Sequence, residues 1–264
     1  MKTVTPVGHF DRLKSDIIGL MAALNTAGII IIGDEILTGK VHDSNSYFLA
    51  GQLWSNGINV CRISVIPDNI DDIAHEVALF SELYDHVFTS GGIGPTHDDV
   101  TIDGISKAFG VRTVISGLLK GILEKRYTTL TAEQIKMAAI PEGAELISDG
   151  NLRFPLIKFR NVYVFPGIPQ LLVTKYHAVE HRFNGPKKFL TRIYYKESES
   201  ALAVSLNEVV AAVKEVKIGS YPVLDNQNYS VMVTLESTDN QVLEAAVALL
   251  IEKAPGNKVE KVVR

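Results

Sequence analysis

Cysteine is nearly absent from this sequence, and its scarcity excludes two kinds of site. Cys61 is the only cysteine in 264 residues, so no intrachain disulfide can form and no zinc site can be built from several cysteine ligands. A single thiol is compatible with a reducing compartment, and we therefore expect a cytoplasmic protein. Cys61 itself stands in the run INVCRISVI, where we interpret it as a buried strand residue.

The sequence also lacks a strong excess of charge of either sign and a long apolar run. Its 26 basic and 30 acidic residues are mixed along the chain, which gives no basic field of the kind that a nucleic-acid backbone requires. The apolar patch at residues 17–24 is too short to cross a bilayer. We therefore expect neither nucleic acid nor membrane as a partner, leave homo-oligomerisation open, and interpret residues 1–25 as an N-terminal extension.

What the sequence does contain is an alternation of strand and helix patterns. The run AGIIIIG at 27–33 is continuously apolar and β-branched, which is typical of a strand buried on both faces. The helix and strand patterns that alternate after it predict parallel strands with helical crossovers. Further along, the patterns at 154–159 and 162–167 predict a β-hairpin. Residues 111–150 are expected to be mainly helix and loop, with one helix ended by Pro141.

A change of pattern marks a second unit. The polar segment NGPKK at 184–188 predicts a domain boundary, and after it come a strand, a helix, two strands and another helix. This order predicts helices on one side of an antiparallel sheet. We therefore expect an α/β domain over residues 26–184, built around a mostly parallel sheet, followed by a small α+β subdomain over residues 188–264.

The segment SGGIGPTHDDVT joins a strand pattern to a helix pattern that is expected to begin at Asp98. Its glycines, Gly91, Gly92 and Gly94, allow the main chain to approach a ligand closely and to point its N–H groups at an anion. The segment has neither the Gly-Lys-Ser/Thr of a P-loop nor the six-residue dinucleotide fingerprint. It therefore predicts a phosphate-binding loop of another type.

Two acidic pairs follow strands of the same expected sheet. Asp34 and Glu35 follow the first strand and Asp98 and Asp99 follow the third, at the sheet edge where ligands of parallel sheets collect. The second pair has an alternative explanation, as a cap and a dipole partner of the next helix. Four carboxylates around one phosphate would repel it unless a divalent cation such as Mg²⁺, Mn²⁺ or Co²⁺ lay between them. The pattern thus favours a metal site at which a diphosphate bond is hydrolysed or transferred.

Several polar residues near the same strand ends give weaker signals. Ser44 is expected to cap the helix that starts there, and Asn45 is a candidate either for capping or for contact with a ligand. Gly167, in the turn FPGIP, permits close approach of a substrate. The isolated charged residues are most simply interpreted as solvated: His97, Arg153 and Lys158.

Three segments carry a resemblance to a known family: AGIIIIGDEILTGKVHDSNSYFLAGQL, VFTSGGIGPTHDDVTIDGISKAFG and VYVFPGIPQLL. They resemble the molybdopterin-binding-like domain that is shared by molybdenum-cofactor enzymes, the bacterial CinA family and eukaryotic FAD synthases. Of these, the N-terminal domain of the FAD synthases is the best match. The resemblance implies a three-layer α/β/α domain around a mixed sheet.

The resemblance also implies an activity. In CinA-like members this domain is a metal-dependent pyrophosphatase for ADP-ribose that favours Co²⁺, and in FAD synthases it is associated with cleavage of FAD to FMN and AMP. The expected function is therefore metal-dependent hydrolysis of a nucleotide diphosphate bond, with FAD as first substrate, ADP-ribose as second, and Co²⁺ or Mg²⁺ as cofactor. Carried onto this sequence, the metal ligands would be Asp34, Glu35, Asp98 and Asp99, and the catalytic residues Asp98, Asp99 and Asp34. The substrate-binding residues would be Gly91, Gly92, Gly94 and Thr96, beside the candidates Asn45 and Gly167.

One departure limits what the resemblance implies. In FAD synthases the half that adenylates FMN is a separate C-terminal domain with a GGKD-type nucleotide loop, and this sequence has no such loop. We therefore do not expect the chain to make FAD by itself. Two other functions stay open: molybdopterin binding or adenylation in molybdenum cofactor assembly, and a catalytically silent regulatory or oligomerising domain of an FAD synthase.

Overall fold

The structure is a computed structural model that describes residues 25–149, 152–254 and 259–264. Contacts between residues divide the chain into two units, of which the first ends at Gly185 and the second begins at Pro186. Each unit is described by itself. The expected N-terminal extension lies outside the described residues, apart from Asn25.

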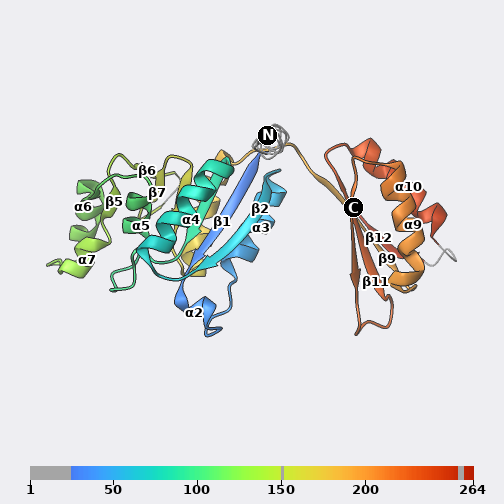
Figure 1. Cartoon of the computed structure of the whole chain (residues 1–264), viewed down its shortest axis with the longest axis horizontal. Helices are drawn as coiled ribbons and strands as arrows, with labels where there is room; N and C mark the ends of the chain where they lie inside the picture. Colours follow the sequence, from blue (N-terminus) through green and yellow to red (C-terminus); the bar gives the residue numbers. More distant parts are fainter. Residues whose placement is uncertain (1–24, 150–151, 255–258) are drawn as a thin grey trace, which may run out of the picture. The chain divides into compact units, whose positions relative to one another are not determined.

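A six-stranded mixed sheet forms the centre of the first unit (Figure 1). Its strands are β1 (Thr26–Ile32), β2 (Asn59–Ile66), β3 (His86–Ser90), β6 (Glu145–Ile147), β7 (Leu156–Phe159) and β8 (Val162–Phe165). They lie in the order β2-β1-β3-β8-β7-β6. The first four strands of that order are parallel, whereas β7 pairs antiparallel with both β8 and β6. The expected parallel sheet and the β7–β8 hairpin are both confirmed.

Helices cover both faces of this sheet (Figure 1). They are α2 (Asp34–Leu37), α3 (Asn45–Ser55), α4 (Ile70–Leu83), α5 (Thr101–Ala108), α6 (Gly117–Arg126), α7 (Ala132–Lys136) and α8 (Pro169–Val179), followed by the 3₁₀ turn η1 (Glu180–Arg182). Successive side chains of a strand point to opposite faces. Accordingly Ile30 and Ile32 of β1 pack in one core with α4 and α5, while Ile29 and Ile31 pack in a second core with α3 and α8. The two cores confirm the three-layer α/β/α architecture.

The region 111–150 contains more strand than its sequence predicts. Besides α6 and α7 it forms β6 and two further strands, β4 (Thr113–Ile115) and β5 (Ala139–Pro141), which pair antiparallel with each other. The expectation that Pro141 ends a helix is wrong, because α7 ends at Lys136 and Pro141 is the last residue of β5. Strands of three residues are too short to show a clear two-residue alternation, so the pattern does not reveal them.

Cys61 is exposed, so the interpretation of this residue as buried is wrong. All seven residues of β1 are buried because this strand lies between β2 and β3. β2, by contrast, is the edge strand of the same sheet, and its residues 61–63 are exposed. The sequence of β2 also differs from that of β1, because NVCRISVI is interrupted by Arg62 and Ser64, which suits a strand at the edge of a sheet.

The second unit is a four-stranded antiparallel sheet with two helices. Its elements are β9 (Phe189–Tyr195), α9 (Glu199–Ala212), β10 (Lys217–Pro222), β11 (Val231–Ser237), α10 (Asn240–Lys253) and β12 (Val259–Val263). The strands lie in the order β10-β11-β9-β12, and Figure 1 shows α9 and α10 on one side of them. The α+β arrangement is confirmed, with β12 as an additional strand. No helix among the described residues has the length and apolar character that a membrane crossing needs.

Candidate functional site

The loop that follows β3 is fixed against the end of β1 by a close approach of two backbones. Gly91 has a φ of +112°, and a Cβ atom placed there would lie 2.0 Å from the carbonyl oxygen of Ile32. The N–H of Gly91 also donates to the carbonyl oxygen of Phe165, at the end of β8, at 3.2 Å. Only glycine satisfies both the angle and the space. The loop therefore begins wedged between two neighbouring strand ends.

The first residue of α5 holds the next part of this loop, which we call the glycine loop (residues 91–100). The Thr101 hydroxyl donates to the carbonyl oxygen of Gly91 at 2.9 Å, and the Thr101 N–H donates to that of Gly92 at 3.0 Å. Gly92 has a φ of +63°, and a Cβ there would lie 2.3 Å from the Thr101 hydroxyl. With these carbonyl groups turned toward α5, the loop has a fixed shape before any ligand binds.

Asp98 and Asp99 do not cap the helix that follows them, so that alternative for the second acidic pair is wrong. α5 begins at Thr101 rather than at Asp98, and its N-cap residue is Val100. Asp99 instead accepts hydrogen bonds from the backbone N–H of Thr96, at 2.7 Å, and from its hydroxyl. The Asp98 side chain is 58% exposed, and the polar Thr96 side chain beside it lowers its pKa, although the hydroxyl proton of Thr96 is donated to Asp99. Asp99 therefore braces the loop, while Asp98 remains open to solvent.

A fifth carboxylate, which the sequence analysis did not single out, joins the two acidic pairs. Asp68 follows β2, and its Oδ2 accepts a hydrogen bond from the N–H of Asp34 at 3.0 Å. Its pKa is raised, first by burial and then by the negative charges of Glu35, Asp34 and Asp98. Carboxylates from the ends of β1, β2 and β3 thus repel one another at one edge of the sheet. Its position in the sequence could have revealed Asp68, because an aspartate that follows the second parallel strand lies at the same edge of the sheet as the two acidic pairs.

The carboxylates are the right type of ligand for a divalent cation, but they are not yet close enough together to coordinate one. Mutual repulsion of the kind that raises the pKa of Asp68 is what a bound cation relieves, and carboxylate oxygens are ligands for Mg²⁺ and related ions. Within the described part of the chain, however, no group of three or more Asp, Glu, His or Cys side chains is close enough to hold a metal ion. His97 is 98% exposed and lies 3.9 Å from the Asp98 carboxylate. The donor set fits a cation only if its side chains move together.

A cleft of about 1210 Å³ lies beside the glycine loop, large enough for a dinucleotide. Two groups of residues line it. The loop group consists of Glu35, Gly91, Gly92, Ile93, Gly94, Pro95 and Asp99, and residues 166–169 adjoin it. The cationic group comes from α6, residues 152–155 and α8, and its charged and aromatic members are Lys125, Arg126, Arg153, Phe154 and Lys175.

Lys175 is the most constrained cation of this cleft. Its Nζ donates to the carbonyl oxygens of Phe154, at 2.6 Å, and Pro155, at 2.8 Å. Burial lowers the pKa of Lys175 to about 8, because the charged ammonium loses water. Of the two cations interpreted as solvated on this segment, Arg153 lines the cleft, whereas Lys158 forms an ion pair with Glu145 at 3.0 Å.

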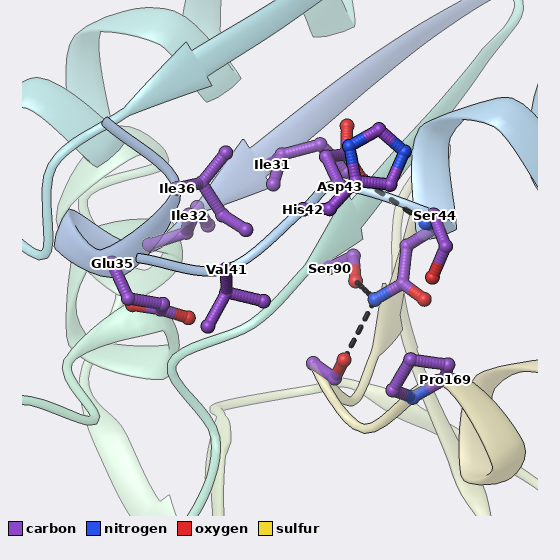
Figure 2. Close-up of a pocket in the computed structure, with 12 residues that line it drawn as sticks. Ile31, Ile32, Glu35, Ile36, Val41, His42, Asp43, Ser44, Ser90 and Pro169 are labelled. Carbon is purple, nitrogen blue, oxygen red and sulfur yellow. Dashed lines mark hydrogen bonds between the residues drawn. The ribbon is translucent and has the colours of Figure 1, made fainter. Parts of the chain in front are cut away.

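Asn45 ties α3 to two other strand ends. Its Nδ2 donates to Ser90 Oγ, at 3.0 Å, and to the carbonyl oxygen of Gly167, at 2.7 Å, the two bonds drawn in Figure 2. These residues line a cavity of about 60 Å³ that we call the small cavity. Asn45 and Gly167, both expected near a ligand, are therefore brought together.

Capping of α3 differs from the expectation. Ser44 occupies the N-cap position, but its side chain makes no capping hydrogen bond. Asp43 takes that role, since its Oδ1 accepts from the backbone N–H groups of Asn45 and Ser46, both at 3.0 Å. Ser44 and Asp43 both line the small cavity (Figure 2).

The expected site residues thus fall into three sets. Glu35, Gly91, Gly92, Gly94, Asp99 and Gly167 line the large cleft, and Asn45 lines the small cavity. Asp34, Thr96 and Asp98 line neither cavity, but Asp34 and Asp98 act on the pKa of Asp68, and Thr96 is bonded to Asp99. All of them belong to the same end of the first unit's sheet.

Comparisons with known proteins identify a family for each of the two units. The family described as "probable molybdopterin binding domain" matches residues 28–183, and the family described as "FAD synthase, middle domain" matches residues 187–263. A crystal structure of the protein CinA from Thermoplasma acidophilum, titled as of unknown function, is 30% identical with a TM-score of 0.57, and the match covers 61% of this chain and 99% of that one.

Similar proteins of known sequence also match most of the chain. A probable FAD synthase from Caenorhabditis briggsae is 32% identical over 89% of this chain and 50% of its own length. A protein from Archaeoglobus fulgidus is 34% identical over 83% of this chain and 93% of its own length. The chain spans about half the length of the FAD synthases it matches. It belongs to the molybdopterin-binding domain family, and its second unit is similar to the middle domain of FAD synthases.

Proposed function

We propose that the chain binds a nucleotide diphosphate in the large cleft and hydrolyses its diphosphate bond in a metal-dependent reaction, with FAD as the favoured substrate and ADP-ribose as the second. One observation carries the proposal: a preshaped glycine loop lies beside carboxylates from three neighbouring strand ends. The similarity to proteins named probable FAD synthase supports a flavin nucleotide as ligand.

The proposal gives each lining group a role. The N–H groups of the glycine loop, at Gly92 and Gly94, would hold the phosphates. Arg153 and Lys175 would balance their negative charge from the cationic group. The ligand therefore meets backbone donors and cations in one cleft.

The carboxylates have a separate role. Asp34, Glu35, Asp68 and Asp98 would hold Co²⁺ or Mg²⁺, and Asp99 could contribute Oδ1 while its Oδ2 keeps Thr96 in place. When bound, such an ion supplies polarisation of the phosphate oxygens. Asp98, exposed and with its pKa lowered, is ionised at neutral pH and would orient the attacking water or accept its proton. Water adds to one phosphorus and the bridging P–O bond breaks, which leaves FMN and AMP from FAD.

A direct assay tests this function. The purified chain is incubated with FAD or ADP-ribose and with Co²⁺, Mg²⁺ or Mn²⁺ in turn, and the products are separated by chromatography. We expect FMN and AMP from FAD, no products with EDTA, and at least about 100-fold slower hydrolysis by an Asp98→Asn variant purified in parallel, which guards against a contaminating hydrolase. Absence of turnover with every metal would rule the hydrolase out.

Binding without turnover is the second candidate, and one observation favours it. Asp99, one of the four carboxylates expected to serve the metal, is engaged in bracing the loop. A regulatory domain that holds a flavin nucleotide, or a molybdopterin-binding protein, needs the loop and cleft but not the carboxylates. In either case Asp98→Ala and Asp34→Ala would leave ligand affinity intact. Retention of molybdopterin without cleavage of FAD would select the molybdopterin role.

A further inference from the structure

A residue that lines the small cavity carries a buried acceptor that has no donor. Asn45 is only 8% exposed, and its Oδ1 makes no hydrogen bond to any described residue. A buried oxygen without a partner costs free energy that the fold does not recover. Asn45 lines the small cavity, so a shift of its side chain toward that space would let a donor from outside the described chain complete this oxygen.

The neighbouring bonds fix which atom of the amide is unpaired. The carbonyl oxygen of Gly167 can only accept, so the atom of Asn45 that faces it must be the NH₂ group. Ser90 donates its own hydroxyl proton to the carbonyl oxygen of Pro166, at 3.2 Å, and therefore accepts from Asn45. Rotating the amide would break both bonds. These three hydrogen bonds therefore fix the orientation of the amide and leave Oδ1 as its unpaired acceptor.

The size and charge of the cavity restrict the missing donor. Its volume of about 60 Å³ suits a water-sized group, but not a whole ring. Its titratable lining includes the carboxylates of Glu35 and Asp43, which repel a phosphate. An apolar group would leave Oδ1 unpaired. A neutral hydroxyl that donates one hydrogen bond meets all three conditions.

The cavity also adjoins the large cleft. Glu35, Gly167 and Pro169 line both, and Figure 2 shows the labelled side chains of Val41, Ser90 and Pro169 around the smaller space. We propose that the small cavity receives one sugar hydroxyl of the nucleotide bound in the large cleft, and that this hydroxyl donates to Asn45 Oδ1. This inference rests on the proposed function, and it makes Asn45 a specificity-determining residue for ribose-type sugars.

The experiment changes the ligand first and leaves the fold untouched. Affinities for FAD and for analogues that each lack one sugar hydroxyl are measured by calorimetry with Mg²⁺ present, in an Asp98→Asn background in which hydrolysis is expected to be slowed about 100-fold. One analogue should bind about tenfold more weakly, because it leaves the buried acceptor unpaired. If all analogues bind within about twofold of FAD, Oδ1 is satisfied by water or by an ion and the inference is wrong.

A variant then locates the effect. Val41 lines the small cavity and is 51% exposed, so Val41→Phe fills the space without removing a core side chain. We expect this variant to bind FAD and the discriminated analogue equally, while Leu37→Phe, an exposed neighbour that lines neither cavity, keeps the tenfold difference. Unchanged discrimination in Val41→Phe would place the hydroxyl elsewhere.

The two proposals fail in different ways. Hydroxyl-dependent binding of FAD without hydrolysis under any metal would overturn the proposed hydrolase and support this inference. Hydrolysis with no dependence on any sugar hydroxyl would do the reverse. No binding of any dinucleotide would overturn both.

Discussion

The two groups of residues that line the large cleft are built in opposite ways. The loop group is held by backbone contacts, in which Gly91 lies against Ile32 and Thr101 bonds to two loop carbonyls. In the cationic group Lys175 is held through its side chain, because its own Nζ donates to the carbonyl oxygens of Phe154 and Pro155. An atom added to the first group therefore meets backbone that has no room for it, whereas the second group depends on the charge and position of single side chains.

The charges of the two groups differ as well. The carboxylates of Glu35 and Asp99 belong to the loop group, and Glu35 also interacts with Asp68, whereas the cations belong to the other group. A ligand that carries only negative charge would be attracted to one group and repelled by the carboxylates near the other. A diphosphate accompanied by a divalent cation satisfies both, which is why this class of ligand explains the contrast best.

Adding one methyl group to the loop group gives the largest expected effect. In Gly91→Ala the Cβ would meet the Ile32 carbonyl oxygen at 2.0 Å and the residue would keep a φ of +112°. Strain and overlap together should lower the free energy of unfolding by about 3 kcal/mol, measured by urea denaturation. Gly110→Ala is the matched control, because its φ is +64° but nothing lies within 4 Å of the added atom. It should cost about 1 kcal/mol. Equal losses in the two variants would show that the close approach does not shape the loop.

Removing one charge next to the loop group should affect turnover and leave stability unchanged. Asp98→Asn keeps the size of an exposed side chain and removes its charge, so the thermal midpoint should not move. Hydrolysis of FAD should fall about 100-fold or more if Asp98 orients or deprotonates water. Asp225→Asn, an exposed aspartate in the second unit, should retain full activity. Full activity in Asp98→Asn would remove this residue from the reaction.

The comparison also shows what the sequence could and could not predict. The isoleucines of β1 fill two cores by simple alternation, so the three layers follow from periodicity. The placement of Gly91 at a strand end also follows from pattern. Asp68 is a single acidic residue and gives a weaker pattern than an acidic pair, although its position at a strand end carries the same information.

The cationic group could not be predicted in this way. Lys175 and Arg153 come from segments separated in sequence, and their meeting depends on how α8 packs over residues 152–155. An isolated lysine carries no local signal of its partners. The same applies to Asn45, whose unpaired oxygen becomes apparent only when Ser90 and Gly167 are placed beside it.

Loosening the brace inside the loop group should have a moderate effect. Thr96→Val removes the hydroxyl that bonds to Asp99 and keeps the shape of the side chain. We expect the affinity for inorganic pyrophosphate to fall about fivefold, because one hydrogen bond contributes about 1 kcal/mol to loop order. Thr96→Ser restores the hydroxyl and should bind like the wild type. If the serine variant binds as weakly as the valine variant, the methyl group rather than the hydroxyl matters.

The smallest effect is expected when the cationic group loses charge through pH. Burial places the pKa of Lys175 at about 8, so its ammonium attracts phosphate below that pH and is mostly neutral at pH 9.5. Affinity for inorganic pyrophosphate should therefore fall about threefold from pH 7 to pH 9.5 beyond the change seen in a Lys175→Met variant. Lys175→Arg keeps its charge over this range and should not show the additional fall.

Unfolding cannot account for such a loss of affinity. An unfolded lysine keeps its proton up to about pH 10.4, so between pH 8 and that value the unfolded chain binds more protons at residue 175 than the folded chain does. The contribution of this residue to the free energy of unfolding therefore rises with pH across the window, and is lost as pH falls through about 8. Between about pH 8 and 9.5 the contribution of Lys175 to stability increases, so a fall in affinity for pyrophosphate over this range cannot come from unfolding. It must come from the loss of positive charge in the cleft. If Lys175→Met shows the same pH profile as the wild type, the anion does not contact this lysine, and Arg153 would be the next cation to change.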